Sequence, residues 1–176
     1  NELLKVQTRK DFKETAFFYP HLTTDKNGDI NFNFTIPEAL TRWKLQLLAH
    51  TKDATSALKT LTTVTQKELM VIPNPPRFLR EGDEIIFSSK IANLSDKKLN
   101  GFAQLVLTDA ISGKEINHLI QNSSTAQNFT VDEKGNTNVS WKLNIPNGIQ
   151  AIQYKIVAKA GDFSDGEQNA LPVLSN

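Results

Sequence analysis

The chain has 176 residues, of which 39% are hydrophobic and 22% charged, an ordinary composition for a globular protein. Twenty basic and 19 acidic residues leave a formal charge of +1, and no basic stripe interleaves with aromatic residues, so we expect no nucleic-acid partner. Cysteine is absent, which excludes thiolate catalysis, thiolate zinc sites and disulfides. No apolar stretch is long enough to span a membrane.

Strand and turn signals alternate through the first third of the chain. Residues 24–29 predict a hairpin turn, because Asn27-Gly28 tolerates the positive φ angles that tight turns require. Residues 30–36 then alternate apolar and polar side chains, as in a half-buried antiparallel strand that Pro37 ends. Alternation and apolar content predict the other strands at residues 3–7, 15–19, 43–50 and 58–64.

Five strands are fewer than the about seven of an immunoglobulin-like sandwich. We therefore expect residues 1–67 to be an incomplete β-sandwich, with one or two further strands upstream in a longer parent chain. Such a sandwich would have a sheet edge with unpaired backbone groups, or one that pairs with a neighbouring molecule.

A proline-rich segment, residues 69–83, separates this part from the next. Pro73, Pro75 and Pro76 exclude a helix, because proline lacks an N–H donor and pushes the preceding residue towards extended geometry. The segment predicts a short strand, a rigid extended crossing and a turn at Arg80-Glu81-Gly82-Asp83. We interpret it as a domain boundary whose prolines limit bending between two sandwiches.

Beyond this boundary, short strands and turn signals recur at regular spacing. Together with residues 69–72 they make seven strands, a pattern typical of an antiparallel immunoglobulin- or fibronectin-like β-sandwich. The predicted strands are residues 84–93, 99–109, 115–121, 126–131, 136–145 and 150–160. Alternation places these side chains in the core: Val139, Trp141, Leu143, Ile145, Ile152, Tyr154, Ile156 and Ala158.

Several motifs resemble the alpha-2-macroglobulin family. The run Arg9-Lys10-Asp11-Phe12-Lys13-Glu14-Thr15, the Asn27-Gly28 hairpin and the corner Pro37-Glu38-Ala39-Leu40-Thr41-Arg42-Trp43 are similar, in order and spacing, to a macroglobulin-domain segment. Residues 76–83 resemble the start of the next macroglobulin domain in bacterial members. These residues have structural explanations: Phe12 and Trp43 are expected to anchor a core, and Arg9 to pair with Glu14.

The resemblance implies an all-β fold of tandem antiparallel β-sandwiches, the macroglobulin domains. Residues 1–67 would be an incomplete macroglobulin-type sandwich, residues 68–164 a complete one, and residues 165–176 the first strand of the next module. In that family, cleavage of a bait region rearranges the domains, and a Cys-Gly-Glu-Gln thioester in a separate domain traps the protease. Asp165-Gly166-Glu167-Gln168 is similar to that motif, but it has Asp in place of Cys, so we interpret it as a polar turn before a strand at residues 170–174.

The expected function is therefore that of a structural scaffold fragment, without bait or thioester, in a protease inhibitor that entraps proteases. The resemblance implies a bacterial protein of the cell envelope (periplasmic or outer surface), or a secreted one. Its expected partners are neighbouring domains of the parent chain and, through the full-length protein, proteases.

No group of residues predicts a reaction or a ligand, so we expect no enzyme activity, no small-molecule ligand, no cofactor, and no catalytic, cofactor-binding or metal-binding residues. Asp25, Asn27 and Asp29 resemble part of a calcium loop, but the ligand pattern is not completed and a hairpin explains them. The three histidines lack metal-ligand spacing and are expected to be surface or interface residues: His21, His50 and His118.

An alternative function is that of a carbohydrate-binding or adhesin-type cell-surface module, which uses the same sandwich and presents aromatic rings on a face or loop. It requires a flat, exposed cluster of aromatic rings, and burial of those rings would exclude it. The candidate rings are Phe17, Tyr19, Phe102 and Tyr154. An enzyme acting through paired carboxylates ranks last, because the acidic residues lie mostly in turns.

Overall fold

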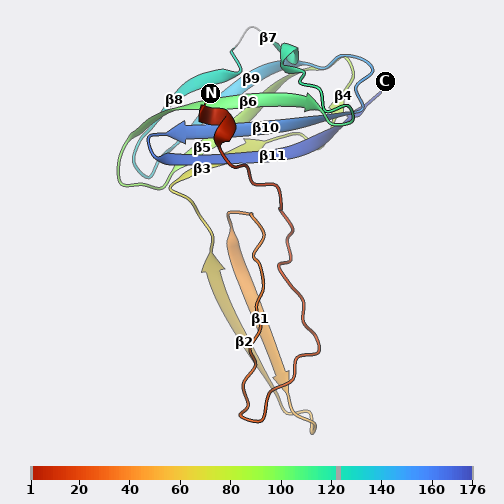
Figure 1. The fold of residues 1–176 in the computed structure, drawn as a ribbon, viewed down its shortest axis with the longest axis vertical. Helices are drawn as coiled ribbons and strands as arrows, with labels where there is room; N and C mark the ends of the chain where they lie inside the picture. Colours follow the sequence, from red (N-terminus) through yellow and green to blue (C-terminus); the bar gives the residue numbers. More distant parts are fainter. Residues whose placement is uncertain (1, 122–123, 176) are drawn as a thin grey trace. The chain divides into compact units, whose positions relative to one another are not determined.

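The computed structural model describes residues 2–121 and 124–175. The chain forms two compact units: unit 1 comprises Asn1–Lys10 and Lys67–Asn176, and unit 2 comprises Asp11–Gln66. Within the described residues the regular elements are β-strands and two short 3-10 turns, η1 (Glu2–Lys5) and η2 (Asn117–Leu119). The all-β prediction is confirmed (Figure 1).

Unit 1 is a β-sandwich of two sheets (Figure 1). One sheet has the strand order β4-β11-β10-β6-β8 and the other the order β3-β5-β9-β7. All pairs are antiparallel except β4 with β11. The strands are β3 (Leu69–Asn74), β4 (Leu79–Arg80), β5 (Glu84–Asn93), β6 (Leu99–Asp109), β7 (Ile120–Gln121), β8 (Ala126–Val131), β9 (Asn136–Asn144), β10 (Ala151–Ala160) and β11 (Phe163–Leu174).

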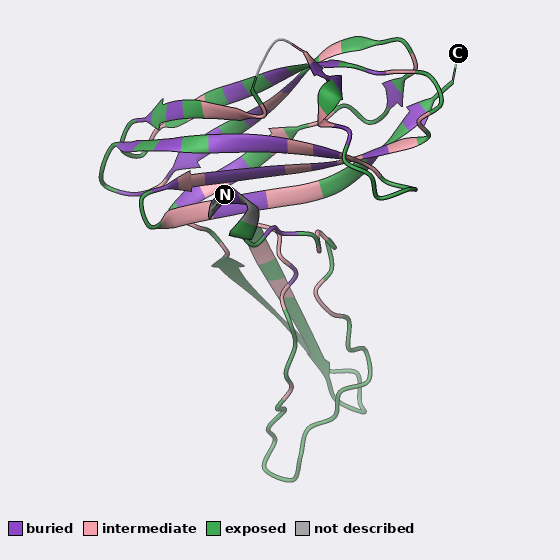
Figure 2. Cartoon of the chain, turned by 45° about the horizontal axis from the view of Figure 1, so that its top comes forward, coloured by how far each residue is buried: buried purple, intermediate pink, exposed green. Residues whose placement is uncertain are grey.

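The strands of this sandwich follow the sequence pattern closely. The predicted strands at residues 84–93, 99–109, 126–131, 136–145 and 150–160 are all present. Residues 115–121 instead form η2 and the two-residue β7. Every side chain expected in the core from β9, β10 and Ile145 is buried, Trp141 and Tyr154 to 1% exposure (Figure 2).

The proline-rich segment lies wholly within unit 1, so the prediction that its prolines limit bending between two sandwiches is wrong. Pro73 is part of β3 and faces Ser89 of β5. Because β3 is an edge strand of its sheet, one side of it has no strand neighbour, and a residue without an N–H is tolerated there. The expected turn is confirmed: Gly82 has φ +81°, and its N–H donates to the Ile145 carbonyl oxygen at 2.8 Å.

Residues 2–10 do not form the strand expected at residues 3–7. They form η1 and an extended stretch, and we name residues 3–10 the N-terminal strap. η1 packs against β10, where Val157 is fully buried although its neighbours Ile156 and Ala158 point into the core on the opposite face of the strand. The N-terminal strap therefore covers part of the outer face of the five-stranded sheet.

Residues 165–168 are part of β11, so the polar turn expected there is wrong. β11 pairs with β10 from Ala160↔Phe163 to Ala151↔Pro172, and Val173↔Leu79 joins it to β4. The predicted strand at residues 170–174 is present as the last part of β11. Residues 165–174 thus complete the five-stranded sheet of unit 1, where the sequence indicated the first strand of a following module.

Unit 2 contains one antiparallel hairpin, β1 (Arg42–His50) with β2 (Ser56–Val64), as predicted for residues 43–50 and 58–64. The turn predicted at residues 24–29 is present, but no strands flank it: Gly28 has φ +89°, and the Asp29 carbonyl oxygen accepts from Asp25 N–H at 2.9 Å. The strands predicted at residues 15–19 and 30–36 are not formed. A half-buried strand needs a second layer of structure that covers its apolar side chains. Unit 2 does not supply that layer for residues 30–36, because Ile30 and Phe34 are 43% and 44% exposed.

Candidate functional site

A cluster of charged side chains lies at the inward-facing positions of β11. Asp165 pairs in register with Ala158, and Glu167 with Ile156, both of which are core residues of β10. Since side chains alternate between the faces of a strand, both carboxylates point towards the interior of the sandwich. They lie where β11 approaches β3, so the cluster is at the edge where the two sheets meet.

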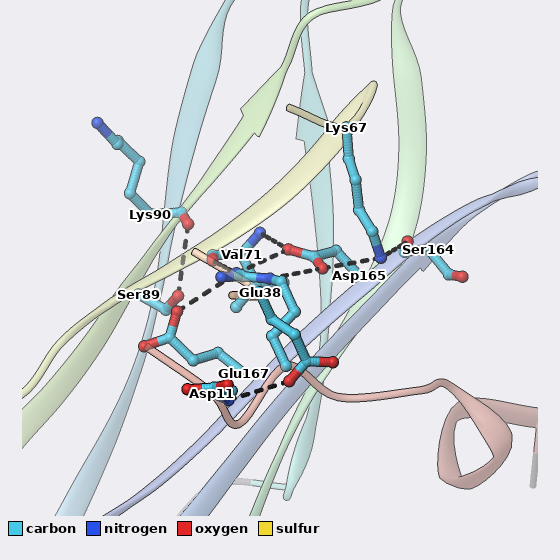
Figure 3. A network of polar contacts seen from close by, with 10 residues as sticks. Asp11, Glu38, Lys67, Val71, Ser89, Lys90, Ser164, Asp165 and Glu167 are labelled. Atoms are coloured by element: carbon cyan, nitrogen blue, oxygen red, sulfur yellow. Dashed lines mark hydrogen bonds and ion pairs between the residues drawn. The ribbon is translucent and has the colours of Figure 1, made fainter. Parts of the chain in front are cut away.

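Asp165 has no exposed surface and accepts contacts at both carboxylate oxygens (Figure 3). Oδ1 accepts from Arg9 Nε at 3.1 Å and lies 3.1 Å from Lys67 Nζ. Oδ2 accepts from Arg9 Nη2 at 3.0 Å and from the Val71 backbone N–H at 2.9 Å. A fully buried carboxylate is stabilised only when it is paired and hydrogen bonded, and these four contacts meet that requirement.

Arg9 brings residues from both sheets together. Its Nη2 donates to the Val71 carbonyl oxygen on β3 at 2.8 Å, and it lies 3.3 Å from Glu167 Oε2 on β11. The two-pronged contact with Asp165 uses the planar fork of the guanidinium, which lysine cannot reproduce. The prediction that Arg9 pairs with Glu14 is wrong, because the strap directs Arg9 into the sandwich edge.

Burial changes the acid–base properties of two groups near this cluster. It raises the pKa of Glu167 above its usual value, against the lowering effect of Arg9. Burial, together with the negative charge of Glu167, raises the pKa of Tyr154 to about 12. For both groups burial is the largest cause of the shift in pKa, so the shifts reflect packing in unit 1.

The backbone of the N-terminal strap also binds β11. Arg9 N–H donates to the Gly166 carbonyl oxygen at 2.8 Å, and Gln168 N–H donates to the Arg9 carbonyl oxygen at 3.1 Å. Gly166 permits this close approach, since a Cβ there would lie 2.8 Å from Thr8 Cγ2 and 2.9 Å from Val157 Cγ1. The strap is thus a one-residue extension of the sheet beside β11.

Unit 2 contains a cluster of four aromatic rings, Phe17, Tyr19, Phe32 and Phe34. The Phe17 ring lies 5.0 Å from Tyr19, 5.3 Å from Phe32 and 4.3 Å from Phe34, centroid to centroid. The interplanar angles range from 28° to 81°, so the rings pack against one another without forming one flat platform.

The aromatic residues proposed for carbohydrate binding are divided between the two units. Tyr154 is buried in the core of unit 1, where its ring lies 5.0 Å from that of Phe87. Phe102, on β6 of unit 1, is 54% exposed, and Tyr19 in unit 2 is 45% exposed. Burial of Tyr154 removes it from any binding platform.

The other residues considered in the sequence have ordinary surroundings. Asp25 accepts the backbone N–H groups of Asn27 and Asp29 through Oδ1, at 2.8 and 2.9 Å, which is the hydrogen bonding of a turn. The three histidines are exposed. In residues 2–121 and 124–175 no three His, Cys, Asp or Glu side chains are grouped as a metal site, and no helix there could cross a membrane.

The buried polar cluster was not identified from the sequence, although a signal for it exists. With period two, Asp165 and Glu167 share a face with Leu171 and Val173, which are buried. Charged residues at inward positions near a sheet edge require a partner of opposite charge. That partner, Arg9, is 156 residues away, and strand periodicity carries no information about contacts at such separation.

Comparison with known proteins shows which family the chain resembles. The model of the Alpha-2-macroglobulin family matches residues 15–105. An alpha-2-macroglobulin of Thermotoga maritima is 26% identical over 169 residues, which are 96% of this chain and 10% of that protein. The chain therefore spans about a tenth of the length of this relative.

Solved structures show the same fold. Escherichia coli alpha-2-macroglobulin activated by porcine elastase superposes with a TM-score of 0.70 at 13% identity, over 99% of this chain and 16% of that one. A Salmonella alpha-2-macroglobulin mutant gives a TM-score of 0.62 at 16% identity, over 86% of this chain and 10% of that one. Because the family model matches more than half of the chain, the chain belongs to the Alpha-2-macroglobulin family.

Proposed function

We propose that residues 1–176 are a structural scaffold within a larger protease inhibitor that entraps its target. The observation that carries this proposal is the fold likeness to E. coli alpha-2-macroglobulin activated by porcine elastase, which extends over 99% of the chain. The polar cluster supports it, because its charged groups are occupied with one another and with backbone groups at a sheet edge. Such an arrangement stabilises a fold and offers no reactive group.

Unit 1 would be a complete macroglobulin domain and unit 2 part of another. The support for the second statement is burial: in β1 only Trp43 and Leu45 are partly covered, and every residue of β2 is exposed (Figure 2). A two-stranded sheet of this kind is marginally stable by itself. We propose that strands from elsewhere in the parent protein pack against it.

The proposed partners are the neighbouring domains and, through the whole parent protein, proteases. The proposed location is the bacterial cell envelope or the medium outside the cell. The family and the bacterial relatives support both proposals, which concern the parent protein more than this part of it.

Entrapment is tested on the parent protein with porcine elastase. The purified parent is mixed with elastase, and hydrolysis of a small peptide and of a large protein substrate is followed in parallel. Entrapment is expected to suppress cleavage of the large substrate while the small peptide is still hydrolysed. Equal cleavage of the large substrate with and without the parent would contradict the proposal; heat-unfolded parent is the control.

A second experiment separates covalent from non-covalent trapping. The parent is treated with methylamine and its peptides are compared with untreated protein by mass spectrometry. An adduct on a Gln-containing peptide outside residues 1–176 would indicate a thioester in the parent. Its absence, together with suppressed cleavage of the large substrate, would indicate trapping by enclosure alone.

A further inference from the structure

Both chain crossings between the two units are adjacent to residues that bind one carboxylate. The chain leaves unit 1 after Lys10 and returns at Lys67. Arg9, one residue before the first crossing, binds Asp165 through Nε at 3.1 Å and Nη2 at 3.0 Å. Lys67, at the second crossing, lies 3.1 Å from Asp165 Oδ1.

We propose that Asp165 is a junction clamp, a single buried carboxylate that holds on β11 the two places where the chain leaves and re-enters unit 1. It acts as a positioning residue: it holds Arg9 and Lys67, which lie beside the two crossings, against β11. This role concerns attachment of unit 2 within the chain and does not depend on protease entrapment.

The contacts around Asp165 concentrate both attachments on one short stretch of β11. Lys67 Nζ also donates to the Ser164 carbonyl oxygen at 3.4 Å, and Arg9 N–H donates to Gly166 at 2.8 Å. Asp165 lies between these two acceptors in the sequence. Displacement of Arg9 or of the Lys67 ammonium group would therefore break contacts to residues 164–166.

Charge balance explains how Arg9 and Lys67 can both bind near Asp165. Arg9 and Lys67 face Asp165 and Glu167, so two positive charges meet two negative ones. The Val71 N–H adds a bond to Asp165 Oδ2 at 2.9 Å, which ties the clamp to β3, the first strand after the second crossing. Because the Asp165 side chain has no exposed surface, water cannot replace a lost partner at low cost.

The test is hydrogen–deuterium exchange on the full chain carrying Asp165→Asn. The amide removes the charge and keeps the size of the side chain. We expect exchange in residues 3–10 and in residues 67–73 to accelerate together, each by ~10- to 100-fold, the effect of losing a hydrogen bond to a charged group. Exchange in residues 139–145 of the core should stay unchanged. The matched control is Asp132→Asn, whose carboxylate pairs with Lys98 at the surface and is 76% exposed.

Acceleration in only one of the two segments, in neither, or equally in residues 139–145 would overturn the proposal. If Asp165→Asn does not fold, Lys67→Met decides, because the Lys67 side chain is 41% exposed and its loss leaves Arg9 on the carboxylate. Faster exchange in residues 67–73 with residues 139–145 unchanged would support the clamp. Unchanged exchange in residues 67–73 would overturn it.

Discussion

The ring of Phe87 lies 5.0 Å from the ring of Tyr154, centroid to centroid, at an interplanar angle of 55°. Phe87 belongs to β5 of the four-stranded sheet and Tyr154 to β10 of the five-stranded sheet, so this contact joins the two sheets through the core. Trp141 is the register partner of Phe87 on β9. The three rings are each at most 1% exposed, which makes them the centre of the hydrophobic packing in unit 1.

Replacing Trp141 by Ala should destabilise unit 1 by about 3–5 kcal/mol, because it removes a buried ring and leaves a cavity. The change also leaves the Thr125 carbonyl oxygen without the indole donor that now lies 3.1 Å away. Chemical denaturation measures the loss of unfolding free energy. The control is Ile86→Ala, at a side chain that is 74% exposed, which should change stability by no more than about 0.5 kcal/mol. Equal losses in the two variants would contradict this account of the core.

Replacing Gly166 by Ala should lower stability by about 1–3 kcal/mol, because the new Cβ would overlap Thr8 and Val157. Thr8→Ser removes the methyl group that would lie 2.8 Å from that Cβ. In the Thr8→Ser background the Ala substitution should therefore cost less, and a double-mutant cycle measures the difference. Additive effects would show that the strap does not restrict position 166.

The pKa of Tyr154, raised to about 12, predicts that the free energy of unfolding depends on pH in the alkaline range. Because the folded state favours the protonated phenol, the stabilisation is complete below the unfolded pKa of about 10 and is lost as the pH rises through the folded value. Ultraviolet absorbance should show a phenolate forming near pH 12. Tyr154→Phe should abolish that phase, and persistence of the phase would assign it to another group.

The raised pKa of Glu167 predicts that the free energy of unfolding depends on pH in the acidic range. The direction is opposite to that of an ordinary ion-paired carboxylate, whose pKa is lowered. Since the folded state favours the protonated acid, its contribution is complete below the unfolded pKa and decreases as the pH rises through the higher folded value. Any stability advantage of Glu167→Gln over the unaltered chain should therefore shrink as the pH falls from neutral towards pH 4. An advantage that grows towards low pH would contradict the direction of the shift.

Thr65 should position Trp43 in unit 2. Trp43 Nε1 donates to Thr65 Oγ1 at 3.0 Å, and that hydroxyl donates to the Ala39 carbonyl oxygen at 2.7 Å. The chain has two Trp residues, so Trp141→Phe leaves Trp43 as the fluorescent reporter. In that background Thr65→Val should shift the emission of Trp43 to longer wavelength and cost about 1 kcal/mol, whereas Thr65→Ser should not. Identical spectra for Val and Ser would rule out the bridging role.

Six strands of unit 1, β3, β5, β6, β8, β9 and β10, were predictable because two signals in the sequence agree there. Alternation gives the inward residues, and Gly, Asn or Asp residues mark the turns, as at Asn147-Gly148 between β9 and β10, where Gly148 has φ +85°. Alternation at residues 30–36 predicted a strand that does not form. The pattern indicates which side chains would be buried, but not whether another part of the chain packs against them.

The buried polar cluster and the attachment of the N-terminal strap were not predictable from local pattern. Asp165 and Arg9 lie 156 positions apart, and the apolar stretch at residues 3–6 suits a short strand as well as the 3-10 turn that forms. The prediction that the proline-rich segment separates two sandwiches was wrong for a related reason. Pro73 is compatible with a strand at the edge of a sheet, and local sequence does not show which strand is at an edge.

The backbone contacts of Arg9 with Gly166 and Gln168 have a consequence for solubility. Unpaired N–H and C=O groups along a strand are a template on which another molecule can add its own strand. The strap and β4 occupy two stretches of the free side of β11, so that template is interrupted in the folded chain. Detachment of residues 3–10 would expose it, and the first result would be self-association of otherwise intact sandwiches.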